Sequence, residues 1–188
     1  MSDEIHSMDY TEPKSGLKYR AKFYADSDRE SPDKEHDCHG VTHETRRSVE
    51  AILEADGLSD DARMRLPLFR ELYSERGSYT YYDVIGSINR AVSEWGCKPE
   101  DAQAAVDQDF EYLRGWYQNE WHWMYVTLTK LDEDGNETTD CTSCGGYESM
   151  LLDGEQELSS VLCGMAWEIE SNIRAELHKN QLELPLAA

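Results

Sequence analysis

Two groups of cysteine and histidine residues are of the types that bind metal ions or carry out thiol chemistry. One is the Cys141-x-x-Cys144 pair. The other is a loop cluster that consists of His36, Cys38, His39 and His43. Zinc is usually held by four nitrogen or sulfur ligands, which a Cys-x-x-Cys pair and a distant Cys/His pair would supply. Because the loop cluster is irregular and lies about a hundred residues from the pair, we predict no bound metal. A zinc site formed by the two groups is the alternative.

Two further segments lack the surroundings that their chemistry requires. A redox-active Cys-x-x-Cys needs a helix N-terminus to lower the thiol pKa, but Gly145-Gly146 follows the pair here. The run from Asp132 to Glu137 superficially resembles a calcium loop, yet it does not have the required spacing of Asp, Gly and Glu. We therefore expect neither redox activity nor calcium binding.

Motifs of common enzyme classes are missing from the sequence. It contains no GxSxG, HExxH or Walker phosphate-binding motif. Cysteine and histidine are present, so an enzyme with Cys or His chemistry, including a metal-dependent one, is a third-ranked alternative. We predict a protein without catalytic residues and without a cofactor.

Acidity is the most informative property of the chain. The formal net charge is −21, and the segment from Pro99 to Glu157 has fifteen carboxylates against only Arg114 and Lys130, a net −13. Such a charge either keeps a protein soluble or presents an anionic surface to a basic partner. It disfavours direct binding to nucleic acid or to an anionic membrane, because both rely on Lys and Arg contacts.

Closely spaced carboxylates on rigid elements can imitate the phosphates of DNA or RNA, since DNA has one charge per roughly 1.7 Å of helix axis. A group of aromatic residues between Trp116 and Tyr125 offers a different binding surface, because Trp and Tyr are enriched at interface hot spots. Most of these rings are expected in the core. The predicted partner-binding residues are Glu100, Asp107, Glu111, Asp132, Glu133, Asp134, Glu137, Asp140, Trp116 and Trp121.

Four phrases resemble a diffuse group of uncharacterised accessory proteins of tailed phages and related mobile elements. They are YRAKFYADSDRESPDKEHD, RLPLFRELY, DFEYLRGWYQNEWHWMYVTL and DCTSCGGYE, about a third of the chain. The histidine usual after the Leu-Pro-Leu phrase is replaced by Glu75, Arg76 and Gly77. The resemblance implies a small phage-encoded protein in a bacterial host and brings no catalytic residues.

Together, acidity and resemblance predict a non-enzymatic inhibitor of a bacterial defence or nucleic-acid-binding protein, of the anti-CRISPR or anti-restriction class, acting by nucleic-acid mimicry. The alternative is an adaptor that binds a protein through its aromatic patch. The expected partner is a basic nucleic-acid-binding surface of a bacterial protein or complex, and the sequence leaves open a homodimer.

Patterns of apolar residues predict the elements that position these side chains. Strands are expected at 17–25, 121–131 and 137–144, with a turn at 134–136 and with Gly145-Gly146 ending the last strand. Helices are expected at 44–55, 83–95, 99–117 and 155–180, and one more helix could begin at Pro67 within the ambiguous segment 63–73.

The expected fold class is α+β, a small antiparallel sheet packed by several helices, with the long C-terminal helix lying across the sheet. Residues 1–16 are expected to be a flexible arm, 17–180 a single domain and 181–188 a tail. The sequence has no secretory signal and no stretch of 18 apolar residues. We therefore expect the protein in the cytoplasm of a bacterial host, with reduced cysteines.

Overall fold

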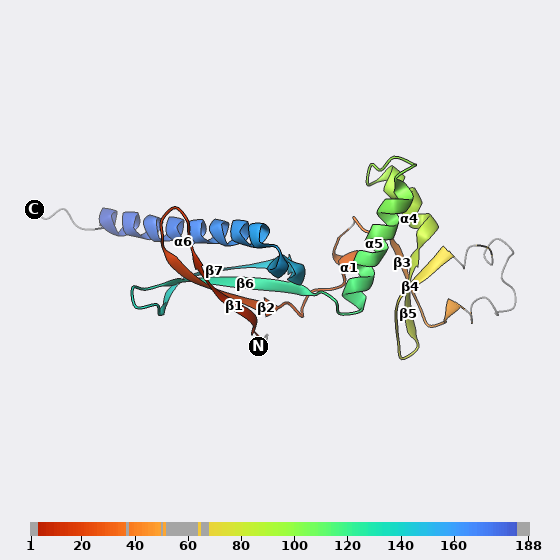
Figure 1. Ribbon diagram of the computed structural model, residues 1–188, viewed down its shortest axis with the longest axis horizontal. Helices are drawn as coiled ribbons and strands as arrows, with labels where there is room; N and C mark the ends of the chain where they lie inside the picture. Colours follow the sequence, from red (N-terminus) through yellow and green to blue (C-terminus); the bar gives the residue numbers. More distant parts are fainter. Residues whose placement is uncertain (1–3, 37, 50, 52–63, 65–67, 184–188) are drawn as a thin grey trace, which may run out of the picture. The chain divides into compact units, whose positions relative to one another are not determined.

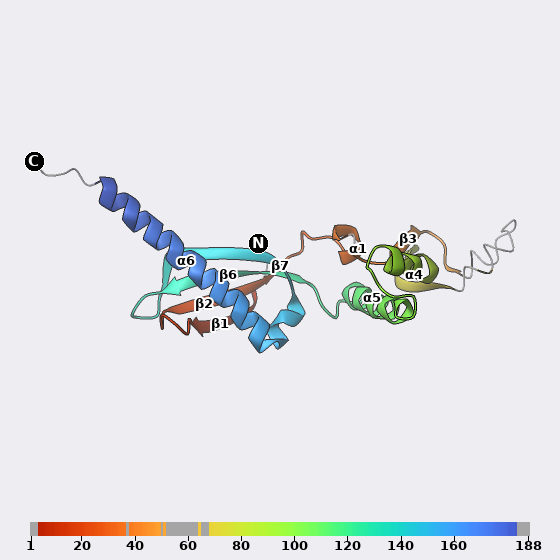
Figure 2. The same cartoon turned by 90° about the horizontal axis from the view of Figure 1, so that it is seen from above.

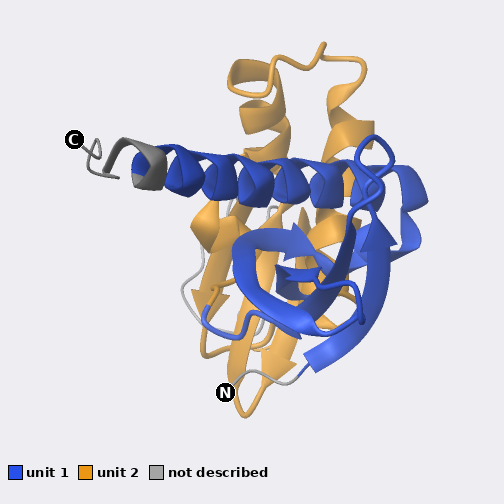
Figure 3. Cartoon of the chain, turned by 90° about the vertical axis from the view of Figure 1, so that its left-hand side faces the viewer, with its two compact units in different colours: residues 1–28, 122–188 blue, residues 29–121 orange. Residues whose placement is uncertain are grey.

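The chain folds into two compact units, as shown by a computed structural model that describes residues 4–36, 38–49, 51, 64 and 68–183. Unit 1 consists of residues 1–28 and 122–188, and unit 2 consists of residues 29–121 (Figure 3). Unit 2 is therefore inserted into the sequence of unit 1. The α+β class is confirmed, but the predicted single domain at 17–180 is wrong, because each unit has its own hydrophobic core.

Unit 1 contains a four-stranded antiparallel sheet in the order β1-β2-β6-β7 (Figure 1). Its strands are β1 (Glu4–Thr11), β2 (Lys18–Ala25), β6 (Trp123–Leu131) and β7 (Glu137–Glu148). The three predicted strands are confirmed. The predicted N-terminal arm is wrong for β1, which pairs with β2 through backbone hydrogen bonds.

Helix α6 (Glu155–Glu183) covers one face of this sheet and crosses it obliquely (Figures 1 and 2). A short 3₁₀ helix, η2 (Ser149–Asp153), leads into it. Side chains that alternate along β2 and β6 meet one stripe of α6, where each fully buried Leu or Phe contributes about 1.5–3 kcal/mol. The shared core consists of Tyr10, Tyr19, Ala21, Phe23, Met124, Val126, Leu128, Leu158, Leu162, Met165, Ala166 and Ile169.

Two details of unit 1 differ from the sequence prediction. Leu177 continues the apolar spacing of the terminal helix, which predicts a buried position, but it is 57% exposed. Strand β7 also continues through Gly145 and Gly146 instead of ending there, because the pairing shifts register at this point. Gly146 has a φ of 83°, a value that glycine adopts at no steric cost. The two glycines therefore make a bulge within the strand.

Unit 2 has a second, three-stranded antiparallel sheet in the order β3-β5-β4, which the sequence did not predict. The strands are β3 (Val41–Thr45), β4 (Phe69–Glu75) and β5 (Ser78–Asp83). The helices are α1 (Pro32–Glu35), α4 (Val84–Ser93) and α5 (Ala102–Tyr117). The helices predicted at 83–95 and 99–117 are thus confirmed, and both contribute to the core of unit 2.

The two remaining helix predictions lie next to this second sheet. Residues 44 and 45, expected to begin a helix, belong to β3. Half of the rest of that predicted helix, residues 50 and 52–55, lies outside the described residues, as does Pro67. The segment from Phe69 is strand β4, not a helix. Arg76 and Gly77 connect β4 to β5 with φ values of 49° and 83°, the positive pair that a tight type I′ hairpin turn requires.

Candidate functional site

The Cys141-x-x-Cys144 pair lies on strand β7, with its two residues on opposite faces of the sheet. Cys144 is opposite the core residue Val126, and Cys141 is opposite Thr129. Side chains alternate between faces along a strand, so residues three apart point in opposite directions. This geometry prevents the pair from forming the chelating knuckle of a zinc site.

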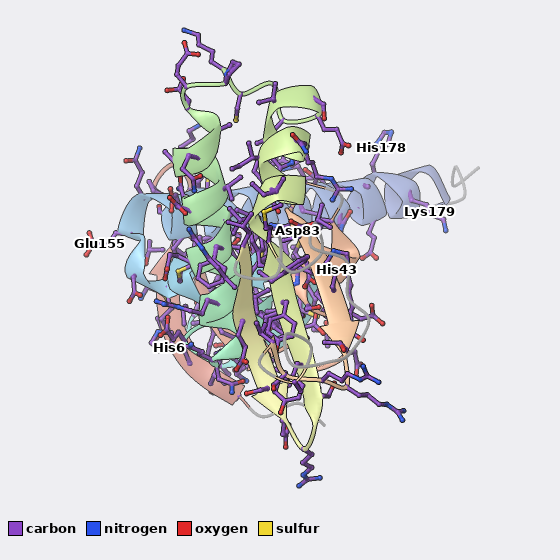
Figure 4. All side chains as sticks on the ribbon, turned by 90° about the vertical axis from the view of Figure 1, so that its right-hand side faces the viewer. His6, His43, Asp83, Glu155, His178 and Lys179 are labelled. Carbon is purple, nitrogen blue, oxygen red and sulfur yellow. The ribbon has the colours of Figure 1, made fainter. Side chains whose placement is uncertain are left out.

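The loop cluster is also dispersed. His36 and Cys38 are exposed, whereas His39 is buried. His43 on β3 lies beside Asp83 at the end of β5, with Nε2 3.7 Å from Oδ2 (Figure 4). Within the described residues, no group of three or more Cys, His, Asp or Glu side chains is placed to hold a metal ion.

A buried hydrogen-bond network in unit 2 is the feature that sequence reasoning missed. Asp109 on α5 lies at its centre, with Oδ1 2.6 Å from His39 Nδ1. Asp109 Oδ2 accepts hydrogen bonds from the Gly40 backbone N–H at 2.8 Å and from the Tyr82 hydroxyl at 2.7 Å. Burial raises the pKa of the Tyr82 phenol, which therefore stays protonated and donates.

Helix α4 extends this network. The Val41 backbone N–H donates to Ser87 Oγ at 2.9 Å, and Arg90 donates to the His39 carbonyl at 2.9 Å. The His39 ring stacks on Tyr112 at 5.4 Å. A histidine beside a carboxylate is the pair that general bases use, but here the carboxylate also accepts hydrogen bonds from Gly40 and Tyr82. The network consequently holds the 39–41 segment against α4 and α5.

Two of the three predicted acidic residues of unit 2 have their negative charge paired with a basic neighbour. Asp107 Oδ1 lies 2.7 Å from Arg70, which lowers the pKa of Asp107 and pairs its charge. Glu111 pairs with Arg114, three residues further along α5. Glu100 is exposed in the turn before α5. Basic partners thus pair the charges of two predicted partner-binding residues on α5, Asp107 and Glu111.

The hairpin between β6 and β7 in unit 1 presents its acidic residues differently. We call Asp132, Glu133, Asp134, Glu137 and Asp140 the acidic hairpin. Glu133 and Asp134 at the tip are exposed. Asp132 Oδ1 accepts the Asn136 backbone N–H at 2.8 Å, and its Oδ2 accepts the Asn136 side-chain amide at 3.2 Å. These bonds lower the pKa of Asp132, so its carboxylate stays ionised.

The base of the acidic hairpin is tied to strand β2. Glu137 Oε1 lies 2.7 Å from Lys22 Nζ and 3.8 Å from the Arg20 guanidinium. Asp140 is half-buried on β7. The exposed negative charge is consequently concentrated at the tip, while the charge of Glu137 at the base is paired.

The two predicted aromatic residues have different environments. Trp121 is only 3% exposed, and its Nε1–H donates to the Tyr112 carbonyl at 3.0 Å. It is a core residue, so its predicted role in partner binding is wrong. Trp116 is half-buried and lines an open groove of about 470 Å³ in unit 2.

No protein-family model, curated protein or solved structure matches this chain. Within the described residues, every helix is too short or too polar to cross a bilayer.

Proposed function

We propose that the protein is a non-enzymatic inhibitor whose acidic hairpin binds the basic nucleic-acid-binding surface of a bacterial protein. The carboxylates of the hairpin take the place of nucleic-acid phosphates. Bacterial defence proteins that bind DNA or RNA are the partner class that the sequence resemblance favours.

The observation that carries the proposal is the ordered, exposed acidic tip. Asp132 and Asn136 pair through both backbone and side chain, so the turn that carries Glu133 and Asp134 is held in one conformation. A preorganised site loses less conformational entropy when it binds. Asp132, Glu133 and Asp134 are consecutive residues of the turn between β6 and β7, and their Cα atoms are about 3.8 Å apart along the chain. The turn therefore presents closely spaced negative charges, as the phosphates of nucleic acid do.

The charge of unit 1 also supports the proposal. Residues 1–28 and 122–188 contain 19 acidic and 7 basic side chains, a net −12. Three of the basic side chains, Arg20, Lys22 and Lys130, are already in ion pairs with carboxylates of the same unit. The remaining field is negative and would accelerate encounter with a basic partner.

Affinity capture from bacterial lysate with the full chain tests this function. The double variant Glu133→Gln/Asp134→Asn removes two exposed charges from the tip, and Glu71→Gln/Asp101→Asn removes two exposed charges from unit 2 as a matched control. We expect wild type and control to capture a basic nucleic-acid-binding protein that duplex DNA or RNA displaces, and the tip variant to lose it. Equal capture by all three proteins, without displacement by nucleic acid, would refute the proposal.

A further inference from the structure

The groove in unit 2 lies among three strands and two helices and has both aromatic and charged walls. Its volume is about 470 Å³, enough for one or two side chains of a partner. The residues that line it are Glu30, Ser31, Lys34, Glu44, Tyr73, Ser78, Thr80, Trp116, Tyr117 and Asn119.

Three aromatic rings form one wall of the groove. The Tyr117 ring contacts Trp116 edge-on, with centroids 5.1 Å apart, and contacts Tyr73 at 5.6 Å. The Tyr117 hydroxyl donates to Asp33 Oδ1 at 3.3 Å, and burial raises the pKa of this phenol. The central ring is thus fixed in place, and the faces of such rings attract cations.

The opposite charges in the groove already form one pair. Lys34 Nζ on α1 lies 2.6 Å from Glu44 Oε1 on β3, and the two side chains are 48% and 58% exposed. Glu30 adds a second carboxylate to the lining. An exposed pair of this kind contributes little stability, about 0–1 kcal/mol, so a competing cation can displace Lys34 at low cost.

We propose that the groove binds an arginine side chain of a partner protein, which stacks on Trp116 and replaces Lys34 as the cation beside Glu44. A guanidinium suits this site because it is planar, stacks on aromatic faces and pairs with carboxylates in a forked geometry. The net charge of the protein repels anionic ligands such as nucleotides. The site lies in unit 2 and does not depend on the acidic hairpin of unit 1.

Calorimetric titration of the full chain at low salt tests the proposal. The ligand is the capped peptide Gly-Arg-Gly-Arg-Gly, and its counterpart carries citrulline, a neutral isostere, in place of arginine. We expect the arginine peptide to bind at least about tenfold more tightly. Trp116→Ala should weaken binding by about three- to thirtyfold, the range of cation–π interactions. Glu44→Gln should weaken it by about two- to fivefold.

Lys34→Met gives the most specific result, because it removes the cation that competes for Glu44. The arginine peptide should bind this variant more tightly than wild type. If the Lys34–Glu44 pair only stabilises the fold, the arginine peptide will bind Lys34→Met no more tightly than wild type.

Matched controls separate the groove from the general negative charge of the chain. Glu71→Gln removes another exposed carboxylate of unit 2, and Trp167→Ala removes a tryptophan of unit 1 that is 71% exposed. Both should bind the peptide as wild type does. If Trp116→Ala lowers the thermal unfolding midpoint, its weaker binding could come from a loss of structure. The Glu44 and Lys34 variants, whose side chains are exposed, then decide the outcome. Equal binding of the citrulline peptide, or Glu44→Gln and Lys34→Met affinities equal to wild type, would overturn the proposal.

Discussion

The two units are stabilised in different ways. In unit 1, alternating residues of β2 and β6 bury an apolar layer under α6. In unit 2, the apolar core around Leu72, Val106 and Phe110 has beside it the carboxylate of Asp109, which is 11% exposed and bonds to His39 and Tyr82. Apolar packing is non-directional and tolerates changes of shape. A buried polar network, in contrast, stabilises the fold only when each of its hydrogen bonds is formed. Unit 2 should therefore be the more sensitive unit to small chemical changes.

Replacing Asp109 with Ala should have the largest effect. The change leaves His39, Tyr82 and the Gly40 N–H without their shared acceptor. Each buried group without a partner costs about 1–3 kcal/mol, so we expect the stability of unit 2 to fall by about 3 kcal/mol or more. Amide hydrogen exchange of each unit, recorded at increasing urea concentration, measures this loss. The exposed Asp101→Ala is the control and should cost less than about 0.5 kcal/mol. An equally small loss for Asp109→Ala would show that the network contributes no stability.

Ile169→Ala tests the apolar core of unit 1 in the same way. Ile169 is 2% exposed, so its truncation should cost about 2–5 kcal/mol through lost burial and a residual cavity. Leu177→Ala on the same helix should change stability by less than about 0.5 kcal/mol, because Leu177 is 57% exposed. If the two variants lose equal stability in denaturant titrations, the face of α6 that we describe as buried is incorrect.

Glycine-to-alanine substitutions should change the free energy of unfolding in opposite directions in the two units. A Cβ at Gly40 would lie 2.2 Å from the Tyr82 hydroxyl and 2.5 Å from Ser87 Oγ, both held in the buried network. We expect Gly40→Ala to destabilise unit 2 by about 1–3 kcal/mol. A Cβ at Gly164, within α6, would meet no atom within 4 Å, so Gly164→Ala should stabilise unit 1 by about 0.4–1 kcal/mol. Thermal unfolding measures both, and a neutral Gly40→Ala would show that the network can move.

The smallest effect concerns the pH dependence of the acidic hairpin. Hydrogen bonds from Asn136 lower the pKa of Asp132 from its ordinary 3.8. A carboxyl whose pKa is lower in the folded state stabilises the fold above its unfolded pKa, and this contribution is lost as pH falls through the folded value. We expect hydrogen exchange at the Asn136 amide to gain protection as pH rises past that range, after correction for intrinsic rates. The same protection in Asp132→Ala would contradict this role.

Sequence patterns were sufficient to predict the helices and strands whose position is determined by the burial of one face. The apolar spacing of α6 and the alternation in β2 and β6 predicted these elements correctly, because one face of each is buried. Strand β1 had no such signal, since most of its residues are exposed and its pairing depends on backbone hydrogen bonds. The sheet of unit 2 was missed because the Arg76-Gly77 turn, which pairs β4 with β5, was not recognised as a hairpin signal.

The candidate sites were less predictable for a related reason. The acidity of the 132–140 segment is visible in composition, but the ion pairs that offset Asp107 and Glu137 involve residues far away in the chain. His39 and Asp109 are 70 residues apart, so no local spacing indicates their contact. The aromatic groove likewise combines short segments from several elements, and only the fold brings them together.

The most direct test of the proposed function is the salt dependence of binding between the full chain and its captured partner. Binding should weaken steeply between about 50 and 200 mM salt, because charges beyond about 8–10 Å are screened at physiological strength. The Glu133→Gln/Asp134→Asn variant should bind more weakly and with a shallower salt slope than wild type, and nucleic acid should compete with both. An affinity that is the same for wild type and variant, is unaffected by salt and is insensitive to nucleic acid would contradict phosphate mimicry by the acidic hairpin.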